Sequence, residues 1–169
     1  MIRFRSEILG AHDRSGFSSG NAKIDAYFRT GVSQDVRRRY ALCYVLIENA
    51  SDRIAGFHTL SSSNIPLIDL PPEMARKLPR YPTIPAVLIG WPGRAIGFRG
   101  QSVGSMLLFD AIARVASSPV GAHALFAEAI DDNAAAFYRA HGFTPLPTRP
   151  MRLFLPMATA ITLAPPGGS

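Results

Sequence analysis

The chain has 169 residues, 47% of them hydrophobic, which predicts one domain over residues 1–169 with a packed core and excludes a disordered chain. Lysine and arginine outnumber aspartate and glutamate by 18 to 12, and the net charge of +6 favours an acidic partner such as nucleic acid or a phosphorylated cofactor. A single cysteine excludes an internal disulfide, and without a signal peptide or a long apolar run the sequence predicts a cytoplasmic protein that stays out of the membrane.

The first part of the chain predicts a strand, helices and a hairpin. Apolar and polar residues alternate over 2–9, which predicts a first strand. Residues 21–40 predict two short helices that are broken near Gly31, because glycine weakens a helix interior. The apolar runs 41–48 and 53–63 are joined by the turn-forming sequence NASD, so they predict a β-hairpin.

The rest of the chain predicts alternating helices and strands. In the proline-rich segment 65–85 we expect one short helix, with Pro72 in its first turn and Pro79 at its end. This order of elements predicts an α/β domain with a mixed sheet. The remaining elements are a strand over 86–90, a helix over 102–118, a strand over 122–130, a helix over 131–141 stopped by Gly142, one or two strands in 151–163, and a flexible tail over 160–169.

The sequence FRGQSVG, residues 98–104, stands between a predicted strand and a predicted helix. Small residues let backbone N–H groups approach an anion, and the helix N-terminus adds the positive end of its dipole. Side chains of Arg99 and Gln101 can add further donors. The loop therefore predicts a diphosphate site, and a ligand-free strand-to-helix turn is the alternative for this stretch alone. Its residues are Arg99, Gly100, Gln101, Ser102, Val103 and Gly104.

Arg-Gly-x-x-x-Gly at 99–104, followed by Asn-x-x-x-Phe-Tyr-x-x-x-Gly-Phe at 133–143, resembles the GCN5-related N-acetyltransferase (GNAT) family. The resemblance implies an α/β (α+β) fold with a mixed, mostly antiparallel central sheet of six to seven strands and about four flanking helices. It also implies that the loop binds acetyl-coenzyme A (acetyl-CoA) as co-substrate, with no metal. Ser102 stands where the family usually has glycine, so backbone approach there requires a negative φ, and some loss of coenzyme affinity is expected.

Two residues in 133–143 receive roles from this resemblance. Tyr138 matches a tyrosine that in many members acts as general acid and protonates the departing coenzyme A thiolate. A phenol suits that role because its pKa, roughly 10, keeps it protonated at neutral pH. Asn133 matches an asparagine that often helps to hold the pantetheine arm. The alternative for Tyr138 is a core aromatic residue with a satisfied hydroxyl.

The front half is similar to the GNAT toxins of bacterial toxin–antitoxin modules, through Phe17-x-Ser-Gly-x-x-x-Ile-Asp-x-Tyr-Phe and the later Gln34-Asp. This resemblance implies that the chain acetylates the α-amino group of aminoacyl-tRNA and so blocks translation. It further implies a ribbon-helix-helix antitoxin as partner and a homodimer. No carboxylate stands out as a general base, and our hypothesis is that water suffices, because an aminoacyl ester amine has a lower pKa than lysine.

A tRNA substrate requires a basic surface for its phosphates. The proline-rich linker supplies one candidate set, and a second candidate follows the first helices; each can also be a solvated surface charge. The candidates are Arg76, Lys77 and Arg80 in the linker and Arg37 after the first helices.

The segment GWPGRAIG, residues 90–97, departs from the strand that precedes the loop in GNAT relatives. Pro92 cannot donate a backbone hydrogen bond and is disfavoured in a central strand. Two alternatives to the toxin function therefore stay open. One is a GNAT that acts on a small amine or a protein N-terminus, and the other is a degenerate, non-catalytic GNAT that only binds antitoxin or RNA.

Overall fold

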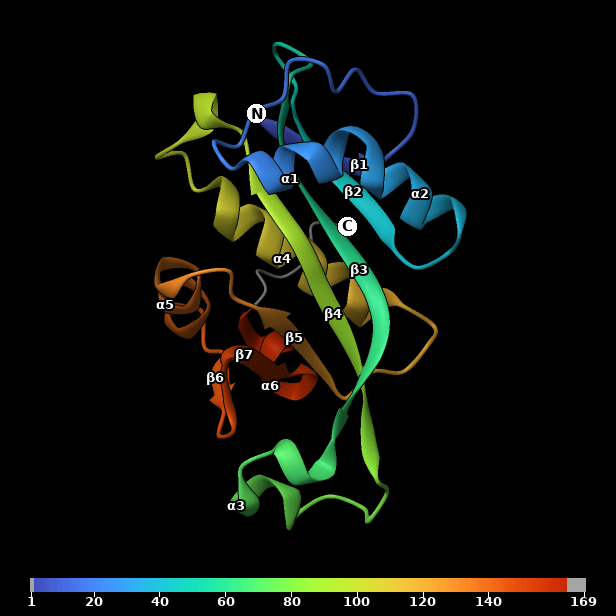
Figure 1. Ribbon diagram of the computed structural model, residues 1–169, viewed down its shortest axis with the longest axis vertical. Coiled ribbons are helices and arrows are strands. Elements are labelled where there is room, and N and C mark those ends of the chain that lie inside the picture. The colour runs from blue at the N-terminus through green and yellow to red at the C-terminus, as the bar shows by residue number, and fades with distance from the viewer. Residues whose placement is uncertain (1, 164–169) are drawn as a thin grey trace. The chain divides into compact units, whose positions relative to one another are not determined.

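The computed structural model of the chain describes residues 2–163, apart from the side chain of Trp91 (Figure 1). Within these residues the chain forms an α/β fold with seven strands, as the sequence predicts. The elements are β1 (Phe4–Ile8), α1 (Ala22–Ala26), a π-helical turn η1 (Tyr27–Gly31), α2 (Val32–Arg37), β2 (Leu42–Glu48), β3 (Ile54–Pro66), η2 (Leu67–Asp69), α3 (Pro72–Ala75), β4 (Thr83–Arg94), η3 (Ile96–Phe98), α4 (Val103–Ser117), β5 (Ala124–Glu128), α5 (Asp132–Ala140), β6 (Thr144–Leu146), β7 (Arg149–Pro156) and α6 (Met157–Leu163).

The chain forms two compact units. The first unit takes the residues up to Ser61 together with Gly90–Ala111, and the second takes Ser62–Ile89 and the residues from Ile112 onward. The chain passes between them inside β3, β4 and α4. The strand order is β1-β2-β3-β4 in the first unit and β3-β4-β5-β7-β6 in the second. That the whole chain acts as one domain stays a prediction.

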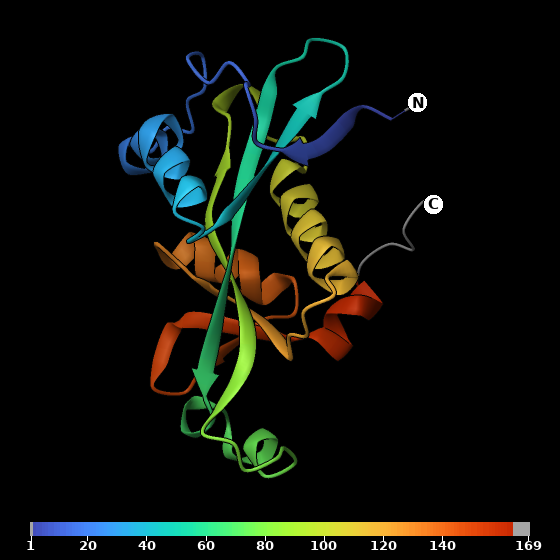
Figure 2. The ribbon, with the colours of Figure 1, turned by 90° about the vertical axis from the view of Figure 1, so that its right-hand side faces the viewer.

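In the first unit, α1 and α2 cover one face of the sheet and α4 covers the other (Figure 2). Successive residues of β3 point to opposite faces, as in any strand. Phe57 stacks on Phe28 with ring centroids 4.1 Å apart, on the side of the first helices. His58 instead points to α4, where its Nε2 lies 2.7 Å from Asp110 Oδ2. The aromatic core beneath α1 is completed by Phe17, whose ring centroid lies 5.6 Å from that of Phe57.

The expected two short helices are present as α1 and α2, but they are joined by the π-helical turn η1, which ends at Gly31, so the helical segment is not broken there. Asn21 caps its start, because its side chain accepts hydrogen bonds from the backbone N–H groups of Lys23 and Ile24. Gly31 keeps helical backbone angles, with φ of −62°. The glycine is required by packing: a Cβ at this position would lie 2.9 Å from Cδ2 of the Tyr27 ring. Tertiary packing therefore overrides the weak helix propensity of glycine.

Strand β4 runs without interruption through the unusual segment, from Thr83 to Arg94. Its parallel register with β5 extends from Ala86 to Ile89, so Pro92 lies beyond that ladder and its missing N–H interrupts none of these pairs. Gly93 is buried, and a Cβ there would come 2.4 Å from Phe57 Cε1. Gly93 on β4 therefore leaves the space that the Phe57 ring on the neighbouring strand β3 occupies.

In the second unit, β5 pairs in parallel with β4 and antiparallel with β7, and β6 pairs antiparallel with β7. The expectation of only strands in 151–163 is half wrong: β7 ends at Pro156, and α6 follows with Met157 and Ala160 buried. This spacing of three residues places both side chains on one helix face. Residues 160–163 of the expected tail are therefore helical, and 164–169 lie outside the described residues. Among the described helices, none is long and apolar enough to span a bilayer.

Candidate functional site

The loop 99–104 lies between η3 and α4 in the first unit, where the sequence places the anion site. Gly100 has a φ of +75°, and a Cβ there would meet nothing within 4 Å, so its backbone faces open space. The first helical hydrogen bond of α4 runs from the N–H of Met106 to the carbonyl of Ser102, at 3.1 Å. The amides before it precede the first intrahelical donor and can point at an anion.

Ser102 has a φ of +60°, so the condition of a negative φ is not met. Two left-handed residues at 100 and 102 turn the chain sharply into the helix, and a side chain at such a position costs about 1–2 kcal/mol. This geometry explains why glycine suits the position. The loop keeps its turn with serine but stores backbone strain that glycine would not.

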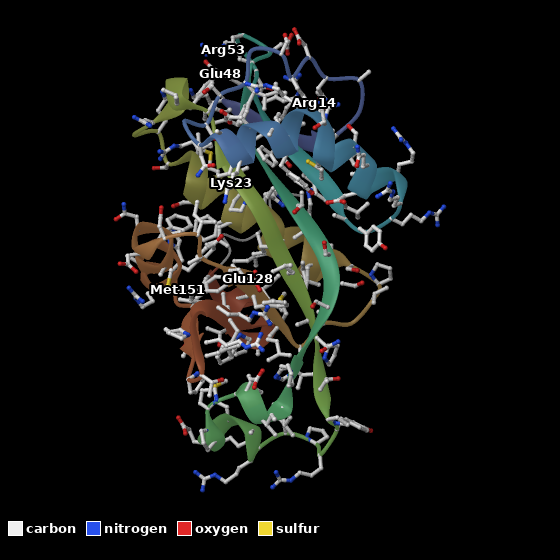
Figure 3. The ribbon with its side chains drawn as sticks, in the orientation of Figure 1. Arg14, Lys23, Glu48, Arg53, Glu128 and Met151 are labelled. Atoms are coloured by element: carbon white, nitrogen blue, oxygen red, sulfur yellow. The ribbon has the colours of Figure 1, made fainter. Side chains whose placement is uncertain are left out.

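Arginine side chains converge on this loop from distant parts of the sequence. The Arg3 guanidinium donates to Gln101 Oε1, and Gln101 Nε2 in turn donates to the Gly97 carbonyl at 3.5 Å. Arg53, in the turn between β2 and β3 (labelled in Figure 3), stacks over Phe98 with its Cζ 5.2 Å from the ring centroid. A Cβ on Gly97 would lie 3.0 Å from Arg53 Nη2, so the last glycine of GWPGRAIG makes room for this guanidinium.

With Arg99, the loop thus gathers three exposed guanidinium groups. Arg3 and Arg53 were missed by the sequence reasoning because they lie far from the motif along the chain. The net charge of +6 is the one signal that pointed to an acidic ligand, and it does not single out residues.

The segment 17–20, which carries the Phe-x-Ser-Gly motif, contacts the residues that precede the loop 99–104 and holds them in place. The buried Asp25 carboxylate accepts hydrogen bonds from the Ser19 backbone N–H at 2.8 Å and the Ser19 hydroxyl at 2.7 Å. The Ser18 carbonyl accepts the N–H of Ile96 at 2.8 Å. Gly20 has a φ of +86°, and a Cβ there would lie 3.4 Å from both Ile96 and the Arg99 guanidinium. The motif therefore fixes the backbone just before Arg99.

Tyr138 and Asn133 both lie on α5 in the second unit. Tyr138 is buried, 4% exposed, with its ring packed against Phe137 and Phe143. Burial raises the pKa of its phenol to about 12. Within the described residues its hydroxyl makes no hydrogen bond to another protein group. Asn133 is exposed at the second position of the helix, which is capped by Asp131 through the N–H of Ala134.

The four predicted phosphate-binding cations are all exposed. Arg76, Lys77 and Arg80 belong to the linker between β3 and β4 in the second unit, which extends away from β5, β6 and β7 around α3 (Figure 1). Arg37 ends α2 in the first unit. Within the described residues, no group of three or more metal-ligating side chains is present.

In this mixed sheet, strand β4 leads into a loop with two left-handed residues and then into a helix, and strand β5 leads into a helix with a buried tyrosine. This arrangement defines the fold of a GNAT acetyltransferase. No protein-family model matches the sequence. Curated proteins do match, among them these two. A probable TacT toxin of Sinorhizobium fredii is 30% identical over 90% of this chain and 89% of its own length, and a tRNA-acetylating toxin of Mycobacterium tuberculosis is 32% identical over 92% and 93%. The chain therefore belongs to the GNAT toxin family.

Solved structures of similar toxins extend this relationship. AtaT complexed with acetyl-methionyl-tRNA superposes with a TM-score of 0.85 at 30% identity, over 95% of this chain and 98% of that one. AtaTR bound with acetyl-CoA gives 0.81 at 30% identity, over 96% and 99%. A tyrosine-to-phenylalanine mutant of AtaT bound to the C-terminus of the antitoxin AtaR gives 0.79 at 27% identity, over 96% and 98%.

Proposed function

We propose that the chain transfers the acetyl group of acetyl-CoA to the α-amino group of aminoacyl-tRNA, blocks translation in the bacterial cytoplasm, and is neutralised by a ribbon-helix-helix antitoxin. The observation that carries this proposal is the loop 99–104, which leads into α4, where the backbone N–H groups before Met106 have no intrahelical acceptor and can bind an anion. Relatives named as tRNA-acetylating toxins, and solved relatives bound to acetyl-CoA, tRNA and antitoxin, support the same reaction.

The loop suits the diphosphate of coenzyme A. Its amides and the helix dipole favour an anion, and Arg99 adds a guanidinium that can pair with phosphate oxygens in a bidentate way. We assign Val103, Gly104 and the rest of the loop to this contact. When bound, the coenzyme supplies a thioester, an acyl group activated for attack by an amine.

Tyr138 suits protonation of the leaving thiolate. A phenol with a pKa of about 12 holds its proton throughout the physiological range. Its hydroxyl has no competing partner within the described residues, so it can turn toward a sulfur atom. Asn133, which lies five residues before Tyr138 on α5, is assigned to the pantetheine arm.

The exposed cations Arg37, Arg76, Lys77 and Arg80 suit the phosphates of the tRNA. Such contacts set position and affinity rather than sequence choice. Their contribution falls as salt rises, because binding releases condensed counterions.

The continuous strand β4 favours an active enzyme over a degenerate one. Pro92 is exposed, and the ring of Phe57 occupies the space beside the buried Gly93 where a side chain would otherwise lie. The segment thus keeps a strand with a packed flank, where a decayed segment would leave a void or a loop.

Transfer of radiolabel from acetyl-CoA to total bacterial tRNA, charged and uncharged, tests the proposal. We expect label on the charged pool only, and a loss of at least about 100-fold with Tyr138→Phe, which keeps the ring and removes the proton. Tyr40→Phe, which alters an exposed phenol, is the matched control and should retain full activity. Equal labelling of charged and uncharged tRNA, or no label on either, would contradict the proposed function. Light scattering of the purified chain checks the homodimer.

A further inference from the structure

Two exposed arginines of the first unit, Arg3 and Arg53, are held by a pair of phenylalanine rings beside the loop 99–104. The Cζ atom of Arg3 lies 5.0 Å from the centroid of the Phe4 ring, and that of Arg53 lies 5.2 Å from the centroid of the Phe98 ring. The two rings meet edge to face, with centroids 6.0 Å apart. A guanidinium that lies over a ring keeps the N–H groups at its edge available for other partners. We call these two residues the arginine pair.

Hydrogen bonds and close packing attach the arginine pair to the loop itself. Arg3 donates to Gln101 Oε1, and Gln101 Nε2 donates to the carbonyl of Gly97 at 3.5 Å. Arg53 approaches the same glycine from its own side, because a Cβ on Gly97 would lie 3.0 Å from Arg53 Nη2. Both guanidinium groups are therefore fixed around the short stretch 97–101, where the chain enters the loop.

No carboxylate compensates the charge of the arginine pair. Asp52, the neighbour of Arg53 in sequence, forms its ion pair with Arg5 instead, at 2.8 Å. Glu48 contacts Arg53 through the backbone, where its N–H donates to the Arg53 carbonyl at 2.9 Å (both are labelled in Figure 3). Among the described residues, neither member of the pair forms an ion pair with a carboxylate. Two uncompensated positive charges thus stand beside the loop.

This charge exceeds what a diphosphate requires. The loop amides, the dipole of α4 and Arg99 already face that group. Arg99 lies apart from the arginine pair's contacts, against Gly20, where a Cβ would be 3.4 Å from its Nη2. Coenzyme A carries a further phosphate, a monoester on the 3′ position of its ribose, with a charge of about −1.5 to −2 at neutral pH. A monoester phosphate matches two guanidinium groups in charge and in number of acceptor oxygens.

Resting on the proposed function, we infer that the arginine pair binds the 3′-phosphate of coenzyme A and selects coenzyme A over its 3′-dephosphorylated form. The loop and Arg99 bind the diphosphate, and the arginine pair binds the phosphate monoester. The edge N–H groups of Arg3 and Arg53 donate to its terminal oxygens, while their faces stay on the phenylalanine rings. The 3′-phosphate is remote from the thioester, so this contact supplies affinity and ligand choice rather than chemistry.

Calorimetric titration of the chain with coenzyme A and with 3′-dephospho-coenzyme A tests the inference. We expect the wild type to bind coenzyme A about 10–30-fold more tightly, as charge-assisted hydrogen bonds at an exposed site allow. In the double variant Arg3→Gln with Arg53→Gln, this preference should fall below about twofold while the affinity for the dephosphorylated ligand is kept. Arg99→Gln should instead weaken both ligands by a similar factor. Arg29→Gln, at an exposed arginine of the same unit, is the matched control and should leave both affinities unchanged.

The readout is a ratio of two affinities measured on one sample, so partial unfolding of a variant lowers both and does not imitate the expected result. Each single variant should reduce the preference by about threefold, which keeps the test valid if the double variant fails to fold. A wild type that binds the two ligands equally, or a double variant that loses affinity for both alike, overturns the inference alone. A wild type that binds neither ligand overturns the proposed function and the inference with it.

Discussion

Restoring a side chain at Gly93 tests the packing of the unusual strand. Gly→Ala in a strand interior ordinarily stabilises by about 0.5–1 kcal/mol. Here a Cβ would lie 2.4 Å from Phe57 Cε1 and 3.0 Å from Ile24 Cγ2. Phe57 is 0% exposed and stacks on Phe28, so it has little room to move.

The 2.4 Å separation from Phe57 Cε1 is about 1 Å shorter than the ordinary contact range, which begins at 3.4 Å. Overpacking of this kind costs typically about 1–3 kcal/mol, which exceeds the gain from the added side chain. We therefore expect Gly93→Ala to lower the free energy of unfolding by about 1–2 kcal/mol. Urea denaturation measures it, with an unchanged m-value showing that the denatured state is the same.

The reasoning also predicts the behaviour of a double mutant. Phe57→Leu alone removes ring contacts and destabilises by about 1–2 kcal/mol, but it opens the space that alanine needs. The two changes together should cost less than the sum of the single changes, by about 1 kcal/mol. Gly121→Ala is the control, because a Cβ there meets nothing within 4 Å. A Gly93→Ala chain as stable as wild type, or strict additivity with Phe57→Leu, would refute the account.

Three further predictions concern the site. Ser102→Gly should raise stability by up to about 1 kcal/mol and tighten coenzyme A binding in calorimetry, because φ is +60° there, and a weaker complex would speak against the assigned loop geometry. Tyr138 has a pKa of about 12 in the folded chain against roughly 10 in the unfolded chain, so its contribution to stability is complete below pH ~10 and is lost as the pH rises through about 12. In urea titrations over this pH window, the free energy of unfolding of the wild type should fall by about 2–3 kcal/mol more than that of Tyr138→Phe. Parallel curves for the two proteins would contradict burial of the phenol. Replacing Arg76, Lys77 and Arg80 together by alanine should lower the slope of log K for tRNA against log salt by about 2–3 in filter binding while coenzyme A affinity stays unchanged, and an unchanged slope would remove these residues from the tRNA surface.

The order of elements, the loop and the helix with Tyr138 were predictable because each depends on local patterns. Period-two and period-3.6 apolar spacing, turn residues and the Gly142 stop all act over a few residues. The continuous helix through Gly31 was not predictable, because its cause is the contact with the Tyr27 ring. The final helix likewise depends on burial of Met157 and Ala160.

The parts of the site that sequence reasoning missed come from pairs far apart in the chain. Arg3 reaches Gln101, Arg53 reaches Gly97, and no spacing rule connects them. Glycines 90, 93 and 97 each accommodate a neighbour in the fold, which is Thr59, Phe57 and Arg53 respectively.

The most direct test of the central claim is the chemical identity of the product. Total aminoacyl-tRNA is incubated with the chain and acetyl-CoA, digested with a ribonuclease, and the terminal aminoacyl-adenosine is analysed by mass spectrometry. The account predicts an acetyl group on the α-nitrogen of the amino acid, present with the wild type and strongly reduced with Tyr138→Phe. Acetyl groups found only on a nucleobase, on the chain itself or on a small amine would contradict it.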